Sequence, residues 1–162
     1  SFLRKNNANM SEFTRGQEYK VFTLSENTRL SAPICFDIFT PEVVRGMVRN
    51  GSDLVVNLSN LAWFGRTTAS DNMVAVLRWR AIENRVTVVF ASNNGESLII
   101  GVNGKNMSKK LGLFEEGALI STLKLQPRFS FYREYAEWVW GGYLLIFLLL
   151  GIQAHLRGKI FE

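Results

Sequence analysis

The sequence contains few of the residues that usually build disulfides, metal centres or rigid turns. Its 162 residues include one cysteine, one histidine and three prolines. A lone cysteine cannot form an internal disulfide, so Cys35 is either reactive or inert. We expect no metal ion and no cofactor. The sequence also lacks an initiator methionine and a signal peptide, and its first residues are typical of a loop within a longer protein.

The chain has no run of like charges, although its net charge is +5. Lysine and arginine are scattered, and no basic stripe with interleaved aromatic side chains is present, which argues against a nucleic-acid partner. The densest basic group, Lys105, Lys109 and Lys110, flanks an Asn103-Gly104 turn. We interpret it as a solvated hairpin tip. A basic surface that faces anionic lipid headgroups is a second interpretation.

One stretch, residues 138–156, contains no aspartate, glutamate, lysine or arginine. A helix needs about 20 apolar residues to cross a bilayer, so this length predicts a single membrane span. Trp138, Trp140 and Tyr143 lie at its front end, where aromatic rings favour the headgroup layer. A buried core helix is the alternative.

The charges that flank this stretch predict its orientation. Arg157 and Lys159 follow it directly, whereas the charges at Arg133, Glu134 and Glu137 before it nearly cancel. Cytoplasmic flanks carry an excess of lysine and arginine, so we expect the C-terminus in the cytoplasm and the preceding residues outside.

The rest of the chain alternates apolar runs with helical patterns. Apolar runs predict strands at residues 19–24, 30–35, 54–58, 86–91, 97–102 and 119–125. Thr40-Pro41 and Ser70-Asp71 are typical helix starts, and each precedes apolar residues at helical spacing. This order predicts an α/β fold.

Cys35 ends the second of these runs, shortly before the first predicted helix. A strand that delivers a thiol to the start of a helix suits a nucleophile, because the helix N-terminus stabilises a thiolate and offers N–H groups to an oxyanion. A buried structural cysteine is the alternative.

Several motifs, in this order, resemble the second half of the carbon–nitrogen hydrolase (nitrilase) superfamily. They are Pro33-Ile34-Cys35-Phe36-Asp37, Pro41-Glu42, Gly51-Ser52-Asp53, Asn57-Leu58-Ser59-Asn60, Ala62-Trp63-Phe64-Gly65, Arg80-Ala81-Ile82-Glu83-Asn84, Ser92-Asn93-Asn94-Gly95 and Phe114-Glu115-Glu116-Gly117. The Ala-Trp-Phe-Gly and Phe-Glu-Glu-Gly elements, with the apolar stretch, are most similar to the bacterial apolipoprotein N-acyltransferases. The resemblance covers residues 10 to 156.

The resemblance implies the second half of an α-β-β-α sandwich followed by one transmembrane helix. Four segments follow from it. They are half of a catalytic domain at residues 1–126, a linker at 127–137, the membrane helix at 138–156 and a cytoplasmic tail at 157–162.

The family's catalytic residues are a cysteine nucleophile, a glutamate general base and a lysine that stabilises the oxyanion. The resemblance makes Cys35 the nucleophile and the Phe36 N–H an oxyanion donor. Asp37 either orients the site or caps the helix that follows. The glutamate and lysine normally precede the cysteine, and Lys5 and Glu12 have the right types but lack the surrounding strand pattern. We therefore expect a fragment or one half of a split enzyme, with the N-terminal half as its partner.

The activity implied by the resemblance is acyl transfer at the bacterial inner membrane, with the catalytic domain on the periplasmic side. An acyl chain would pass from a phospholipid to Cys35 as a thioester, and then to the N-terminal amine of a diacylglyceryl lipoprotein. The expected pocket residues are Asn60, Trp63, Phe64 and Asn93.

Two positions depart from the family pattern. Leu61 stands where aspartate is usual, and Asn72 lies near a common histidine. These departures keep two alternatives open. One is a membrane-tethered amide hydrolase that uses water as the acceptor, and the other is an inactive, structural half of a split nitrilase-fold protein.

Overall fold

The protein, seen in a computed structural model, is described for residues 16–125 and 128–158. Its centre is one five-stranded sheet with strand order β1-β2-β3-β4-β5. The elements in chain order are β1 (Phe22–Ser25), β2 (Thr28–Ser31), the 3-10 helix η1 (Cys35–Phe39), α2 (Pro41–Arg49), β3 (Leu54–Ser59), the 3-10 helix η2 (Ala62–Phe64), α3 (Ala69–Asn84), β4 (Thr87–Ser92), β5 (Leu98–Ile100) and α4 (Phe131–Gly158).

The sheet is mixed. Strands β2, β3 and β4 run parallel, whereas β1 and β5 pair antiparallel at its edges. The carboxyl ends of parallel strands meet at one edge of a sheet. The residues that follow β2, β3 and β4, including Cys35, Asn60 and Asn93, therefore gather at a single edge.

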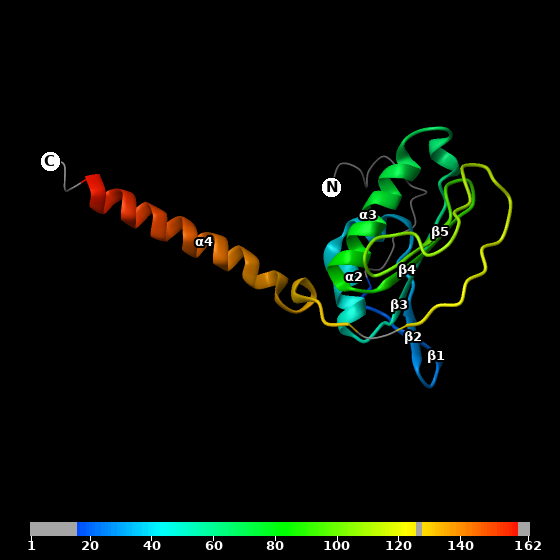
Figure 1. Ribbon diagram of the computed structural model, residues 1–162, viewed down its shortest axis with the longest axis horizontal. Coiled ribbons are helices and arrows are strands. Elements are labelled where there is room, and N and C mark those ends of the chain that lie inside the picture. Colours follow the sequence, from blue (N-terminus) through cyan, green and yellow to red (C-terminus); the bar gives the residue numbers. More distant parts are fainter. Residues whose placement is uncertain (1–15, 126–127, 159–162) are drawn as a thin grey trace, which may run out of the picture.

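Helices α2 and α3 cover one face of the sheet (Figure 1). Along β3, the buried side chains of Val55, Asn57 and Ser59 alternate with Leu58, which is 49% exposed on the opposite face. The core beneath the helices is apolar and includes Ile38, Val44, Leu77, Val88 and Phe90. Its burial holds η1, α2 and α3 against the sheet.

The structure changes the limits of several predicted strands. The expected strands at residues 19–24 and 30–35 are shorter and shifted, because Ile34 makes only an isolated parallel bridge to Leu58 and Cys35 begins η1. The strand expected at 97–102 is limited to β5. Residues 119–125 form no strand, so that expectation was wrong. Within the described part of the chain, they pair with none of the five strands of the sheet.

Of the two predicted helix starts, one is confirmed and the other is wrong. Thr40 is the N-cap of α2 with Pro41 at its first position, as expected. The cap of α3 is Thr68, so the expectation for Ser70 was wrong. The Ser70 hydroxyl instead accepts a hydrogen bond from the Glu96 N–H, which ties α3 to the start of the β5 hairpin.

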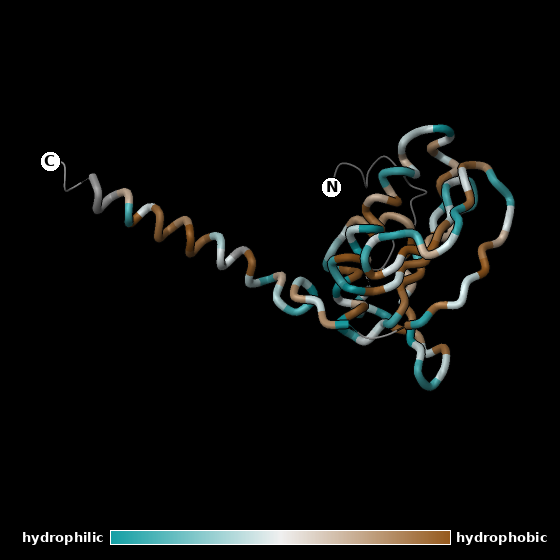
Figure 2. Tube along the Cα trace, viewed as in Figure 1, coloured by the Kyte–Doolittle hydropathy of each residue, from teal (hydrophilic) through white to brown (hydrophobic). Residues whose placement is uncertain are grey.

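Helix α4 leaves the domain and extends away from it, with apolar residues along its later turns (Figures 1 and 2). It begins at Phe131, within the segment expected to be a linker. Among the described residues, no single helix has both the length and the hydropathy of a membrane span. Two arms of α4, Phe131–Val139 and Gly141–Ala154, meet at 42° and reach that length and composition only as a pair.

Candidate functional site

Cys35 occupies a strained turn at the sheet edge. Its φ angle is 50°, in the left-handed region that non-glycine residues seldom adopt, and its side chain is partly exposed. Such strain costs about 1–3 kcal/mol and persists only where neighbouring contacts hold it. The turn therefore places the thiol beyond the carboxyl end of β2, at the first residue of η1.

Asn57 supplies one of these contacts from β3. Its side-chain amide is fully buried and donates hydrogen bonds to the carbonyl oxygens of Pro33 (2.9 Å) and Cys35 (3.2 Å). Its own carbonyl oxygen accepts a hydrogen bond from the Ser59 hydroxyl at 2.8 Å. The sequence interpretation missed this role. The available signal was a polar residue within the apolar run of β3, because a buried polar group requires partners.

Asp37 closes the same turn from the other side. Its carboxylate accepts a hydrogen bond from the Ile34 N–H at 3.0 Å, while its own N–H donates to the Ile34 carbonyl at 3.0 Å. In this geometry Asp37 caps the 3-10 turn that contains Cys35. The Phe36 N–H lies in the first turn of η1, where helix N–H groups lack intrahelical partners.

Aromatic side chains bring η1 and η2 together. The ring centroid of Phe36 lies 5.2 Å from that of Phe39 and 6.2 Å from that of Phe64. All three rings remain partly exposed, and Trp63 is 84% exposed. The expected pocket residues Trp63 and Phe64 thus belong to a loop that lies beside the Cys35 turn, and Phe64 makes the contact.

Two other expected pocket residues hold each other in place. The Asn93 side-chain amide donates to the Asn60 side-chain oxygen at 2.8 Å, and the Asn93 oxygen accepts from the Leu61 N–H at 3.1 Å. Asn60 also accepts from the Ala62 N–H, which fixes the start of η2. These contacts join the ends of β3 and β4 at the edge that carries Cys35.

The two departures from the family pattern have different surroundings. Leu61 is 4% exposed and joins the core, so its apolar side chain fills space beneath the loop. Asn72 is exposed on the first turns of α3. Lys5 and Glu12 lie outside the described residues.

A further aromatic residue, Phe114 of the Phe-Glu-Glu-Gly motif, borders this edge and was not among the expected pocket residues. The guanidinium of Arg66 lies 4.8 Å above the Phe114 ring, and the Phe114 N–H donates to the Asn94 carbonyl. A groove of about 390 Å³ runs between the Asn93-Asn94 turn and this loop, which also contributes Glu115 and Glu116.

The Arg80-Ala81-Ile82-Glu83-Asn84 motif lies at the end of α3, away from Cys35. Arg80 and Glu83 form a largely buried ion pair with an N–O distance of 2.9 Å. Burial raises the pKa of Glu83 above its usual value, against the opposing effect of the Arg80 guanidinium. The Asn84 amide is buried and donates to the Arg80 carbonyl. This motif therefore stabilises the helix end in the structure.

The chain is similar to apolipoprotein N-acyltransferases of several bacteria. An apolipoprotein N-acyltransferase of Geobacter metallireducens is 35% identical over 136 residues, which is 84% of this chain and 26% of that protein. The apolipoprotein N-acyltransferase of Thermotoga maritima is 30% identical over 159 residues, which is 98% of this chain and 31% of that protein. The chain thus spans between a quarter and a third of the length of these relatives.

Solved structures share the fold. Nit3 of Saccharomyces cerevisiae, a nitrilase-superfamily member, matches 64% of this chain and 40% of its own, with a TM-score of 0.55 and 22% identity. An amidase from Nesterenkonia sp. matches 62% of this chain and 40% of its own, with a TM-score of 0.53 and 27% identity.

The family comparison agrees with the geometry of the site. Residues 4–128 match the carbon-nitrogen hydrolase family, and this range includes the Cys35 turn, the Asn60–Asn93 pair and the whole mixed sheet. A match over most of the chain, with the same fold in solved relatives, leads to one conclusion: the chain belongs to the carbon–nitrogen hydrolase family.

Proposed function

We propose that this chain carries the nucleophile of an apolipoprotein N-acyltransferase. The observation that supports this most directly is the Cys35 turn, which is strained at φ 50°, held by Asn57 and Asp37, and partly exposed at the sheet edge. The names of the relatives supply the acyl-transfer class.

The reaction proceeds in two balanced steps. A base takes the proton of the Cys35 thiol, and the thiolate attacks the ester carbonyl of a phospholipid. The C–S bond forms, the ester C–O bond breaks, and the base returns the proton to the departing lipid alkoxide. The N-terminal amine of a diacylglyceryl lipoprotein then attacks the thioester, the C–N bond forms, the C–S bond breaks, and the amine proton passes to a base. Sulfur suits both steps, since a thiolate is nucleophilic near neutral pH and leaves readily from a thioester.

Several groups support these steps. The Phe36 N–H donates to the oxyanion, and the exposed rings of Phe36, Phe64 and Trp63 offer an apolar wall for the acyl chain. The glutamate base and the lysine of the triad belong to the N-terminal half of the sandwich, on the same or a separate chain. General-base geometry then requires them within about 3–4 Å of the reacting atoms.

The membrane is the source of the acyl donor in this proposal. Helix α4 crosses the bacterial inner membrane with its apolar arm, the domain lies on the periplasmic side, and residues 157–162 lie in the cytoplasm. Exposed apolar side chains along α4 support this arrangement, for example Leu145, Phe147 and Leu150, which are 59%, 77% and 58% exposed.

A trapped acyl-enzyme tests the mechanism. The complete enzyme that contains this chain is incubated with phospholipid and no acceptor, and intact-protein mass spectrometry measures the mass of one acyl chain on Cys35. We expect hydroxylamine to remove it, since thioesters are labile to that reagent. Cys35→Ser loses turnover, whereas Ser108→Ala, at a partly exposed residue outside the expected site, keeps it. An unmodified Cys35 in an active preparation would refute the mechanism.

The acceptor distinguishes acyl transfer from hydrolysis. Amidases of Nesterenkonia sp. with a reactive active-site cysteine share this fold, so water is the competing acceptor. When a lipidated peptide with a free N-terminal amine is added to the acyl-enzyme, we expect the amide product to exceed the free fatty acid. Release of fatty acid alone would identify the chain as part of a hydrolase.

A further inference from the structure

A basic groove lies at the edge of the sheet opposite Cys35. It has two connected parts of about 270 Å³ and 450 Å³, which share Asp53, Arg85 and Arg128. These parts lie at the amino ends of β3 and β4 and beside the first turn of α4. Its basic lining residues are Arg29, Arg49, Arg85, Lys105, Lys124, Arg128 and Arg133, and its acidic ones are Asp53 and Glu134.

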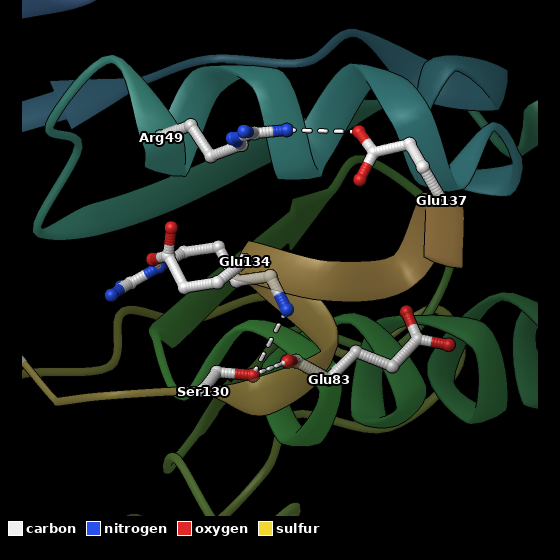
Figure 3. A network of polar contacts seen from close by, with 6 residues as sticks. Arg49, Glu83, Ser130, Glu134 and Glu137 are labelled. Carbon is white, nitrogen blue, oxygen red and sulfur yellow. Dashed lines mark hydrogen bonds and ion pairs between the residues drawn. The ribbon is translucent and has the colours of Figure 1, made fainter. Parts of the chain in front are cut away.

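Four of these basic side chains have no acidic partner in the described part of the chain. Arg29 has Asp53 as a partner, Arg133 has Glu134, and Arg49 reaches Glu137 at 2.9 Å (Figure 3). Within residues 16–125 and 128–158, no carboxylate pairs with the side chains of Arg85, Lys105, Lys124 and Arg128. They face a common hollow with a net positive charge.

Backbone geometry keeps the floor of the groove open. Gly51 has φ 97°, and a β-carbon there would meet the Arg29 guanidinium at 2.4 Å, so only glycine lets this guanidinium lie along the groove. Arg85 is the C-cap of α3 in the left-handed conformation at φ 53°, a position that usually favours glycine. A charged side chain thus stands in the groove at a site where glycine would be the less strained choice.

We propose that this groove binds a phosphate group, from a lipid headgroup or in solution. Guanidinium groups match phosphate oxygens bidentately, so several arginines in one hollow favour phosphate. The lining contains no aromatic ring on which a nucleobase could stack, which disfavours single-stranded nucleic acid.

Helix α4 makes the headgroup the favoured source. Arg133 lines the groove, and a rise of about 1.5 Å per residue places Tyr143, at the apolar arm, about 15 Å further along the helix. A bilayer entered by that arm therefore brings its headgroups toward the groove. The phosphate site itself does not depend on the proposed acyl transfer, and only the lipid source depends on α4 entering the bilayer.

Arginine side-chain NMR of the full chain in neutral detergent micelles tests the groove. Inorganic phosphate, phosphatidylglycerol and phosphatidylcholine are titrated separately, and the Nε–Hε signals of the groove arginines Arg29 and Arg133, which every variant below retains, are followed. We expect saturable shifts. Arg85→Gln with Arg128→Gln should weaken binding by about 25-fold, since each cation near an anionic surface contributes about fivefold. Arg66→Gln with Lys109→Gln removes the same charge at the other end of the sheet and should leave the affinity unchanged.

The affinities for the three probes decide whether the groove binds phosphate and from which source. Tighter binding of phosphatidylglycerol than of inorganic phosphate supports the headgroup, and equal affinities support a phosphate site filled from solution. Arg85→Lys keeps the charge but lacks the bidentate guanidinium, so it should weaken binding less than Arg85→Gln, which separates charge loss from misfolding. Absence of saturable shifts with all three probes, or equal weakening in the Arg66/Lys109 control, would overturn the proposal.

Discussion

At the scale of single residues, the Cys35 turn depends on one buried amide. Asn57 satisfies the backbone carbonyls of Pro33 and Cys35, and Ser59 in turn satisfies Asn57. Such a network is stable only when every member has a partner, because an unpaired buried group loses its hydration without compensation. The position of Cys35 is therefore determined by a residue on a different strand.

Replacement of this amide should damage both stability and reactivity. We expect Asn57→Ala to lower the free energy of unfolding by about 1–3 kcal/mol, since a carbonyl of Pro33 or Cys35 is left unsatisfied. The rate of Cys35 alkylation by iodoacetamide should also change, because the turn relaxes. Ser59→Ala removes only the outer contact and should affect alkylation less. Identical alkylation rates in the wild type and Asn57→Ala would contradict this role.

At the scale of elements, α4 is attached to the domain by polar contacts at its base. The Ser130 hydroxyl donates to the Glu83 carbonyl at the end of α3, and Glu137 pairs with Arg49 of α2 at 2.9 Å (Figure 3). Glu137 also pairs with Arg45 of α2 at 3.1 Å. The packing of α4 on the domain is therefore polar, whereas its distal arm is apolar and exposed.

The buried Arg80–Glu83 pair near this attachment should make stability depend on pH. Burial raises the folded-state pKa of Glu83 above the usual glutamate value of 4.5. A raised carboxyl pKa favours the folded state most below the unfolded value, and this contribution is lost as pH rises through the folded value. We compare the wild type with Glu83→Gln by chemical denaturation. The free energy of unfolding of the wild type, relative to the variant, should fall from pH 4.5 toward neutral pH. A relative stability that rises instead would show that the ion pair outweighs burial.

The orientation of α4 is a separate prediction. In a Cys35→Ser background, a cysteine at Lys159 should react with a membrane-impermeant maleimide only after the cytoplasmic side is opened, because Arg157 and Lys159 favour that side. A cysteine at Lys109, in the domain, should react in intact cells with a permeable outer membrane. Labelling of position 159 from the periplasm would refute the orientation.

At the scale of the whole molecule, one face of the sheet is covered and the other is open. Helices α2 and α3 bury the first face, whereas the second exposes Ile34 at 66% and Leu58 at 49%. Exposed apolar faces and strand edges favour association. This open face is where the sandwich implied by the family would place its other sheet.

Residues 1–137 expressed alone should therefore aggregate or remain molten. Light scattering should show less association for Leu58→Lys, whereas Ile120→Lys, at an apolar residue that is 94% exposed but outside the sheet, should not have this effect. The N-terminal half, fused or added separately, should restore a soluble product. A monodisperse product that unfolds cooperatively from residues 1–137 alone would show that the domain is self-sufficient.

The sequence alone determined the family, the α/β class and the start of α2 at Pro41. These features follow from local patterns, which are contained within short segments. The tertiary structure decided the rest. It ended β2 before Ile34, placed Asn57 against the Cys35 turn, and gathered Arg85 with Arg128 into one groove. Each of these depends on contacts between residues distant in sequence, which no local pattern encodes.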